Sequence, residues 1–367
     1  MTIETPERHV VAIQMLRGIA ATMVVFVHLD TELDRLHFQR LGSDWLATGV
    51  DIFFVISGFI MWTSVERRRG ISAGEFLKNR IIRIVPLYWL MTSLLVFVAL
   101  VAPQLLRTTK LEPAHAIASY LFLPARHPTT HNFWPLLVPG WSLNYEMLFY
   151  VIFATALLLS AGARVARFAW IAGMIVGVLL AARAAEGRLD VMHFYANSVM
   201  LEFLVGMVLG VICTNGWVRS SYAFLPITIL GFIVLWPGAH LYSWLPAAGV
   251  GATMIVGGAI FLPQIRPNPL SRLGDASYSL YLIHAMLLAA FTTVWEWLGI
   301  RPVMPLFIGA SLAIAFAGAF VVYTCFEVPV TEALKRRYRH PRPQEPSVRP
   351  LEAIPDPDAA SGSTLPG

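Results

Sequence analysis

An arginine and a histidine lie inside the first long apolar stretch of the chain, "MLRGIAATMVVFVHLD" (residues 15–30). Arg17 and His28 are eleven residues apart, so in a helix they share one face, with Cα atoms roughly 16 Å apart along the axis. A charged side chain in a membrane span costs several kcal/mol unless it is paired or solvated, so both residues are candidates for function. The alternative is that Arg17 reaches the lipid headgroups and His28 lies at the opposite interface.

A carboxylate in a later apolar stretch, "GWSLNYEMLFYVIF", needs a polar partner of its own. Glu146 is expected near the outer end of its span, as His28 is, so we expect the two side chains to pair. A carboxylate on one imidazole nitrogen would fix the tautomer and leave the other nitrogen as a general base. Glu202 and Glu327 are further acids in apolar stretches, and Glu202 is equally consistent with a structural pair with an arginine.

Two arginines precede the apolar run of "EFLKNRIIRIVPLYWL". Arg80 and Arg83 are three residues apart and therefore share a helical face. Such a pair can grip the phosphates of a cytoplasmic nucleotide or of coenzyme A. The alternative is that the two residues only anchor the helix at the cytoplasmic headgroups.

Small and hydroxylated residues mark two further stretches. In "TGVDIFFVISGFIM", Ser57, Gly58 and Phe59 fit either close helix packing or a site, and Asp51 fits an interface carboxylate. In "LGDASYSLYLIH", four polar side chains recur at helical spacing: Ser277, Tyr278, Tyr281 and His284. The last two share a face, and either interior packing or a ligand role explains them.

The elements that carry these residues are predicted to be membrane helices. The chain is 57% hydrophobic and 13% charged, with a mean hydropathy of +0.64, beyond what soluble domains show. Continuous apolar runs of roughly twenty residues favour helices over a β-barrel. We expect an all-α polytopic bundle of about ten transmembrane helices, at about 11–29, 46–63, 84–102, 141–160, 168–183, 191–213, 222–236, 245–262, 276–298 and 303–325.

Charge places the ends of the chain. Lys and Arg concentrate after the second, fourth, sixth and eighth predicted spans and after the last one, so both termini are expected in the cytoplasm, with the protein in the bacterial inner membrane. The net charge of +5 then reflects topology and not nucleic-acid binding. We expect residues 1–335 to form one transmembrane domain and 336–367, rich in Pro, Ser, Gly and Asp, a disordered cytoplasmic tail. The histidines are too scattered to predict a metal site.

Six motifs, in this order, resemble the membrane-bound acyltransferase family 3: "MLRGIAATMVVFVH", "GVDIFFVISGF", "KNRIIRIVPLYW", "WSLNYEMLFY", "ASYSLYLIH" and "FEVP". The resemblance runs from about residue 11 to 335. These are bacterial O-acyltransferases that modify exopolysaccharides, lipopolysaccharide O-antigens, Nod factors and some macrolides. One departure is that many relatives have two adjacent acids in the fourth motif, where this chain has only Glu146.

The resemblance implies transfer of an acyl group, usually acetyl from cytoplasmic acetyl-CoA, to a hydroxyl of a saccharide or lipid-linked oligosaccharide. It implies a site made of His28, Glu146 and Arg17 with the Arg80–Arg83 pair and the Ser57, Gly58 and Phe59 element. We expect His28 to be the catalytic base, or a transient acyl carrier, and Arg17 to neutralise charge. Ser57 or Tyr281 would stabilise the oxyanion.

The main alternative is a transporter or flippase for a glycolipid or polysaccharide precursor, in which Arg17, His28 and Glu146 form a proton relay. The acceptor, the acyl chain and the oligomeric state stay open. The outer loop "LFLPARHPTTHNFWPLLVPGW" is consistent either with a sugar-binding face or with an interfacial aromatic belt.

Overall fold

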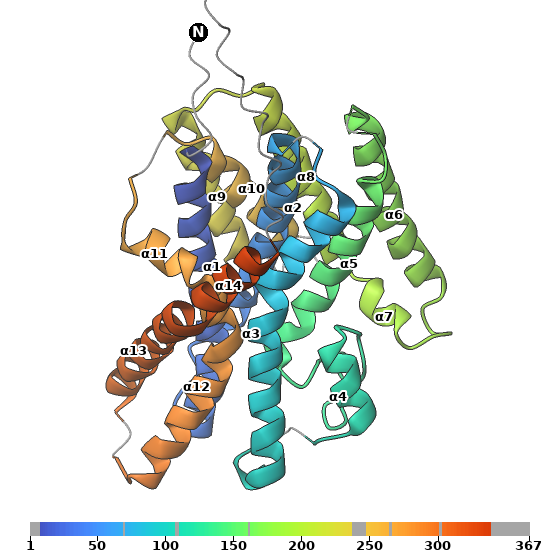
Figure 1. The fold of residues 1–367 in the computed structure, drawn as a ribbon. Coiled ribbons are helices and arrows are strands. Elements are labelled where there is room, and N and C mark those ends of the chain that lie inside the picture. The colour runs from blue at the N-terminus through green and yellow to red at the C-terminus, as the bar shows by residue number, and fades with distance from the viewer. Residues whose placement is uncertain are drawn as a thin grey trace, which may run out of the picture.

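The fold is a bundle of helices (Figure 1), seen in a computed structural model that describes residues 8–68, 70–106, 110–160, 162–236, 247–263, 266–300 and 303–338. Within these ranges all regular structure is helical. The α-helices are α1 (Arg8–Arg35), α2 (Gly49–Arg67), α3 (Ala73–Val101), α4 (Pro113–Tyr120), α5 (Trp141–Ala156), α6 (Arg164–Ala184), α7 (Met192–Tyr195), α8 (Val199–Asn215), α9 (Leu225–Leu235), α10 (Ala247–Ile260), α11 (Pro269–Asp275), α12 (Ser277–Trp297), α13 (Met304–Val322) and α14 (Val328–Arg337).

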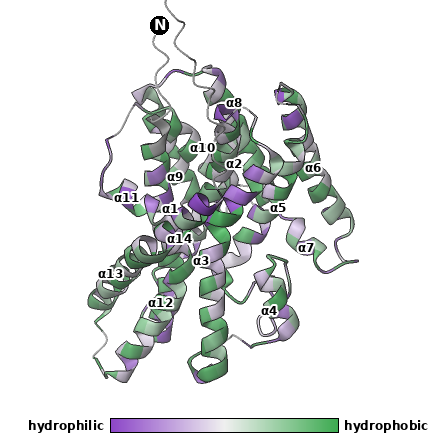
Figure 2. Ribbon diagram, viewed as in Figure 1, coloured by the Kyte–Doolittle hydropathy of each residue, from purple (hydrophilic) through white to green (hydrophobic). Residues whose placement is uncertain are grey.

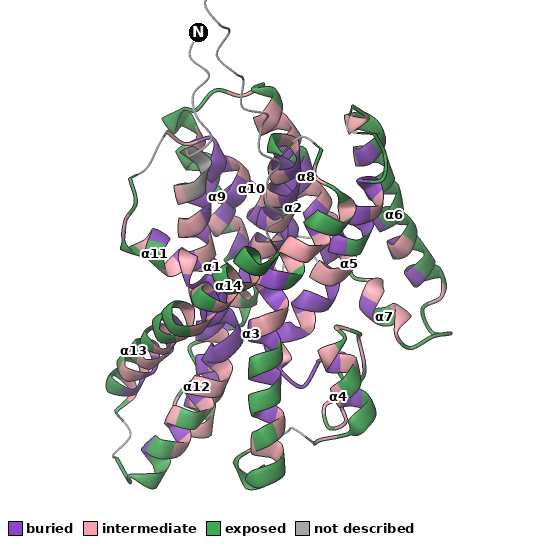
Figure 3. Ribbon diagram, in the orientation of Figure 1, coloured by how far each residue is buried: buried purple, intermediate pink, exposed green. Residues whose placement is uncertain are grey.

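The outer surface of the bundle is apolar, as a lipid environment requires. Seven helical stretches of the described chain are long and apolar enough to cross a membrane, and two shorter apolar ones accompany them. Phe97 and Leu100 on α3 are 59% and 67% exposed, and exposed apolar turns recur along α3 and α13 (Figures 2 and 3). Soluble proteins rarely expose apolar surface on this scale, whereas the hydrocarbon core of a membrane solvates it. The chain is therefore a multi-pass membrane protein.

The ten predicted spans each coincide with helix, and the differences lie at their ends and breaks. The span predicted at 84–102 begins earlier, at Ala73, because the hydroxyl of Ser72 accepts the Glu75 N–H and caps the helix. The span predicted at 191–213 is interrupted between α7 and α8, where the Asn197 side chain accepts the Val199 N–H. The predicted outer loop after α3 contains the short helix α4.

The last predicted span ends in a π-helical turn, Tyr323–Glu327, that joins α13 to α14. Single π turns recur at functional sites because the extra residue redirects side chains. Here the turn buries Glu327, which accepts a 2.6 Å hydrogen bond from the hydroxyl of Ser279 on α12. Beyond the turn, α14 crosses the bundle and contacts α3 (Figure 1).

Close packing of α2 on α8 fixes one wall of the bundle. A methyl group at Gly58 would overlap the carbonyl of Phe203, and one at Gly206 would overlap the carbonyl of Val55. Glycine at both positions lets the backbones touch, which is the usual route to tight association in membranes. Nearer the start of both helices, Glu202 contacts Asp51. The arginine partner considered for Glu202 is therefore wrong.

The last described helix runs past the predicted end of the transmembrane domain at residue 335. Helix α14 ends at Arg337, two residues inside the predicted tail 336–367. Residues 339–367 lie outside the described residues, so the disordered cytoplasmic tail stays a prediction.

Candidate active site

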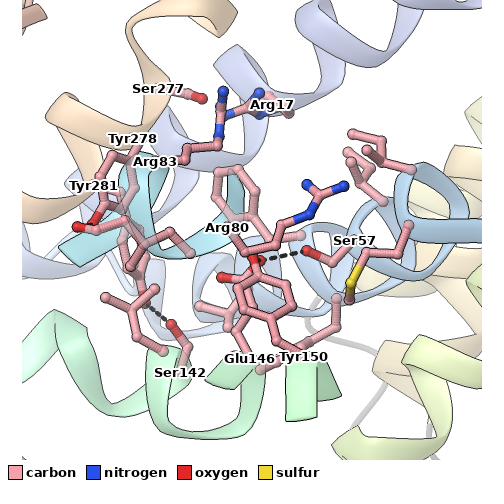
Figure 4. A pocket seen from close by; sticks show the side chains of 18 of the residues that line it. Arg17, Ser57, Arg80, Arg83, Ser142, Glu146, Tyr150, Ser277, Tyr278 and Tyr281 are labelled. Atoms are coloured by element: carbon pink, nitrogen blue, oxygen red, sulfur yellow. Dashed lines mark hydrogen bonds between the residues drawn. The ribbon is translucent and has the colours of Figure 1, made fainter. Parts of the chain in front are cut away.

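A cavity of about 320 Å³ lies between α1, α2, α3, α5 and α12. Figure 4 shows its polar side chains converging from these helices. Six of the predicted site residues line it: Arg17, Ser57, Arg80, Arg83, Glu146 and Tyr281. These residues span more than 260 positions of sequence, so the fold of the whole bundle is needed to bring them together.

The Glu146 carboxylate is held by two hydroxyl groups on the cavity wall. Its Oε1 accepts hydrogen bonds of 2.8 Å from Ser57 on α2 and 2.7 Å from Tyr150 on α5 itself. The predicted pairing of Glu146 with His28 is wrong, because His28 has different partners, described below. The sequence predicts where the helices of Glu146 and His28 end. It does not predict how the two helices are shifted and rotated relative to each other, which decides whether the side chains meet.

Three arginines line the cavity together with Glu146, the one carboxylate among the described residues of its lining. The Glu327 carboxylate lies near Arg17 and Arg83. Within the described residues, Arg17 donates one side-chain hydrogen bond, of 3.3 Å, to the Gln14 amide oxygen. Arg80 donates to the Ser64 hydroxyl at 3.2 Å and lies over the rings of Phe76 and Tyr150. The wall therefore has more positive than negative charge in a setting where an unpaired charge is unfavourable, an arrangement that suits an anionic ligand.

A second, larger cavity of about 970 Å³ opens beside the first, between the end of α2, the start of α3 and the end of α14. We call it the basic vestibule. Its wall carries one acid, Glu75, and six cations: Arg67, Arg68, Lys78, Arg80, Arg83 and Lys335. Arg80 and Arg83 line both cavities, so they stand at the junction between the vestibule and the membrane-embedded cavity.

Hydroxyl groups line the side of the cavity nearest α12. The Tyr281 and Ser142 hydroxyls are 2.8 Å apart and join α12 to α5. The Ser277 hydroxyl is fully buried, belongs to the same cavity lining as Arg17 (Figure 4), and has no hydrogen-bond partner among the described residues. A buried hydroxyl without a partner is available to a ligand.

His28 does not line the cavity and lies one layer behind its wall. Tyr281 lines the wall, and His284 follows one turn later on α12, with ring centroids 6.3 Å apart. His28 contacts His284 in turn, with Nδ1 of His28 3.1 Å from Nε2 of His284. The histidine that was expected beside Glu146 is therefore paired with a second histidine.

Gly58 and Phe59 also lie away from the cavity. Gly58 faces α8, as described above, and Phe59 is buried in the apolar cluster between α1, α2 and α10. The structure gives both a packing role, which corrects their expected place at a donor site. Of this motif only Ser57 reaches the cavity.

Several residues of the cavity were not singled out from the sequence. Tyr150 binds Glu146 from four positions along α5, and Gln14 binds Arg17 from three positions along α1. Helical spacing from the predicted acid and the predicted arginine is the signal that would have found both. The contribution of Lys335 to the vestibule depends on the path of α14, for which the sequence gives no signal.

The site can be compared with known proteins. A sequence profile described as an acyltransferase domain matches residues 10–324, most of the chain. The chain belongs to acyltransferase family 3. Exopolysaccharide production protein ExoZ of Rhizobium meliloti is 36% identical over 253 residues, which cover 65% of this chain and 75% of that protein.

More distant relatives of this acyltransferase carry explicit activity names. Acyltransferase MdmB of Streptomyces mycarofaciens is 24% identical, covering 88% of this chain and 86% of that protein. Peptidoglycan O-acetyltransferase OatA of Listeria monocytogenes is 24% identical, covering 86% of this chain and 56% of that protein. No solved structure matches. The predicted family and enzyme class are confirmed.

The described part of this family 3 acyltransferase contains no group of three or more His, Cys, Asp or Glu side chains that could hold a metal ion. The polar groups of the cavity are guanidinium, hydroxyl, carboxylate and, at Gln14, amide groups. These groups bind anions, orient carbonyl groups and move protons, which are the tasks of acyl transfer.

Proposed function

We propose that this acyltransferase moves an acyl group, acetyl in the first instance, from cytoplasmic acyl-CoA to a hydroxyl of a sugar in an exported polysaccharide or glycolipid. The observation that carries the proposal is that Arg80 and Arg83 line both the basic vestibule and the membrane-embedded cavity. A donor with phosphates at one end and a thioester at the other fits that arrangement.

The basic vestibule is the proposed site of the phosphates of coenzyme A. Six cations against one acid give the attraction that several phosphates require, and arginine forks suit phosphate oxygens. Arg80 and Arg83 would hold the phosphates nearest the junction. The pantetheine arm would then extend along the cavity past Arg17 and Glu146 to the wall at Tyr281. His28 lies behind that wall, so the proposal requires the thioester to pass Tyr281 to reach the base.

The proposed base is His28. A sugar hydroxyl attacks the thioester carbonyl carbon while His28 takes the hydroxyl proton, and the carbon–sulfur bond then breaks to release the coenzyme A thiolate. The proton passes from His28 to that thiolate, so the enzyme ends as it began. The Ser57 proton is already donated to Glu146, so Tyr281, whose hydroxyl can accept from Ser142 and keep its own proton free, is the proposed donor to the oxyanion of the tetrahedral intermediate. Holding both reactants together supplies proximity.

Arg17 and Glu146 are proposed to manage charge along this path. Arg17 would attract the donor and stabilise negative charge near the thioester, and the unpartnered hydroxyl of Ser277 in the same lining would be available to the donor. Glu146, held by Ser57 and Tyr150, would keep the three arginines in place before the donor arrives.

The acceptor is proposed to arrive from the face opposite the vestibule. The concentration of Lys and Arg on the vestibule side supports a cytoplasmic location for that face and for both termini, in a bacterial inner membrane. The names of the ExoZ and OatA relatives, an exopolysaccharide production protein and a peptidoglycan O-acetyltransferase, support a surface polysaccharide as the acceptor class.

The test is acyl transfer by the purified protein in lipid nanodiscs. Radiolabelled acetyl-CoA is supplied with lipid-linked exopolysaccharide repeat units, and the wild type is compared with His28→Ala and with the control Thr292→Val, a buried change on α12 away from the cavity. We expect the wild type and Thr292→Val to label the lipid-linked sugar and His28→Ala to lose transfer. If no variant consumes acetyl-CoA and the wild type instead moves the glycolipid across vesicles, the transporter alternative replaces the proposal.

A further inference from the structure

The two histidines behind the cavity wall form one hydrogen-bonded unit. The rings of His28 on α1 and His284 on α12 meet edge to face, with centroids 4.6 Å apart and planes at 81°. His284 is fully buried, whereas His28 is partly exposed. Of the two rings, only that of His28 therefore has any exposed surface.

Two backbone carbonyls determine where the protons are. Nδ1 of His28 lies 3.1 Å from the Val24 oxygen, and Nδ1 of His284 lies 3.0 Å from the Leu280 oxygen. A carbonyl oxygen only accepts hydrogen bonds, so both Nδ1 atoms carry a proton. In neutral rings both Nε2 atoms are then unprotonated.

The contact between the rings has one consistent direction. Nε2 of His284 accepts from Nδ1–H of His28 at 3.1 Å, and that proton is shared with the Val24 oxygen. Three of the four ring nitrogens are thereby paired. The remaining one, Nε2 of His28, has a free lone pair and no partner recorded among the described residues, and it belongs to the ring that is partly exposed.

We propose that His284 is a positioning residue that fixes the tautomer and orientation of His28, so that Nε2 of His28 is the base for acyl transfer. This inference rests on the proposed function, in which His28 takes the acceptor proton. When Nε2 of His28 gains that proton, the ring becomes a cation while Nδ1 still donates to Nε2 of His284. A neutral imidazole then fills the place that a carboxylate holds in serine hydrolase triads.

The direct test is the nitrogen NMR spectrum of the full-length protein labelled with ¹⁵N-histidine, in nanodiscs and without substrate. We expect the neutral His28 ring to carry its proton on Nδ1 in the wild type. In His284→Leu the His28 signals should divide between the two tautomers, because the second acceptor is gone. A wild-type spectrum with the proton on Nε2 of His28 overturns the proposal.

The kinetic test compares two replacements of His284. His284→Leu removes the acceptor, and we expect kcat to fall about 10- to 100-fold with an unchanged KM for acetyl-CoA, as loss of a charge-assisted hydrogen bond predicts. His284→Gln keeps an acceptor oxygen near the Nε2 position and should stay within about fivefold of the wild type. The control Thr292→Val should match the wild type.

Equal losses in the Gln and Leu variants, or a wild-type kcat in His284→Leu, would overturn the positioning role. The Tm of each variant is measured beside its kcat, and only variants with the Tm of the wild type are compared, so that a folding defect is not mistaken for a loss of catalysis. If the wild type transfers no acetyl group, the proposed function fails, while the NMR spectrum still decides which nitrogen of His28 carries the proton. The two failures are therefore distinguishable.

Discussion

Ser57 and Glu146 lie on facing helices, and the Ser57 hydroxyl donates a 2.8 Å hydrogen bond to Oε1 of the carboxylate. This bond joins α2 to α5 across the cavity, and the Tyr150 hydroxyl completes the contact from the next turn of α5. The carboxylate is therefore fixed before any ligand arrives. Because Glu146 shares the cavity lining with three arginines, removing its negative charge should change the charge balance of the whole site.

Glu146→Gln removes this charge and keeps the Oε1 oxygen to which both hydroxyls donate. We expect kcat to fall by about 100-fold or more, because the arginines lose their counter-charge, while Tm changes by only a few degrees. Acetyl transfer and thermal unfolding in nanodiscs measure the two effects. Tyr150→Phe, which removes one hydroxyl and no charge, is the control. Equal losses in both variants would assign the effect to hydrogen bonding and not to charge.

Arg83→Ala should weaken donor binding more than it slows chemistry. Arg83 lines both cavities, and loss of one charge-assisted contact to phosphate predicts a rise of about 10- to 100-fold in KM for acetyl-CoA. Stabilisation of the fold by added coenzyme A should fall in parallel. The control is Arg336→Ala, since the Arg336 side chain is 79% exposed on α14 and does not line either cavity. An unchanged KM in Arg83→Ala would remove Arg83 from the donor path.

Gly58→Ala tests whether this glycine serves packing. The added methyl group would overlap the Phe203 carbonyl on α8, so we expect a loss of about 1–3 kcal/mol in stability. Gly173→Ala on α6 is the matched control, because a methyl group there meets nothing within 4 Å and should be neutral or slightly stabilising. Thermal unfolding in detergent compares the two. A Gly58→Ala protein with full stability but reduced donor binding would return Gly58 to the site.

The sequence predicted the membrane class, the position of each long helix and most of the polar side chains that line the cavity. Apolar length and rare charged residues carry that information because hydrocarbon penalises both short spans and unpaired charges. Partners were harder to predict. Glu146 and His28 were both expected near the outer ends of their helices, but the depth and rotation of each helix depend on contacts such as Gly58 against Phe203.

The π-helical turn was also beyond sequence reasoning. "YTCFEVP" reads as the end of an apolar span, and nothing in its spacing predicts that Glu327 turns inward to Ser279. The His28–His284 contact was equally hidden, because both residues were placed on polar helix faces but the faces were not paired. Hydrophobic periodicity predicts which face of a helix is polar, but only tertiary packing decides which faces meet.

The pH dependence of stability should contain a contribution from His127, in the loop after α4. Burial, and secondly the neighbouring His115 ring at 5.3 Å, lower the pKa of His127 below its ordinary value of 6.5. The unfolded chain then binds a proton more readily than the folded one, so stability is present above pH 6.5 and is lost as the pH falls below it. His127→Gln should flatten the decline in Tm over this range. An identical decline in both proteins would contradict this assignment.

The central claim is that the donor enters from the basic vestibule and the acceptor from the opposite face. The most direct measurement uses sealed membrane vesicles of known orientation, with radiolabelled acetyl-CoA outside and the acceptor glycolipid exposed only to the lumen. We predict labelled glycolipid when the vestibule faces the added acetyl-CoA, and none when the vesicles are inverted. Labelling only in the inverted orientation, or in neither, would contradict the account.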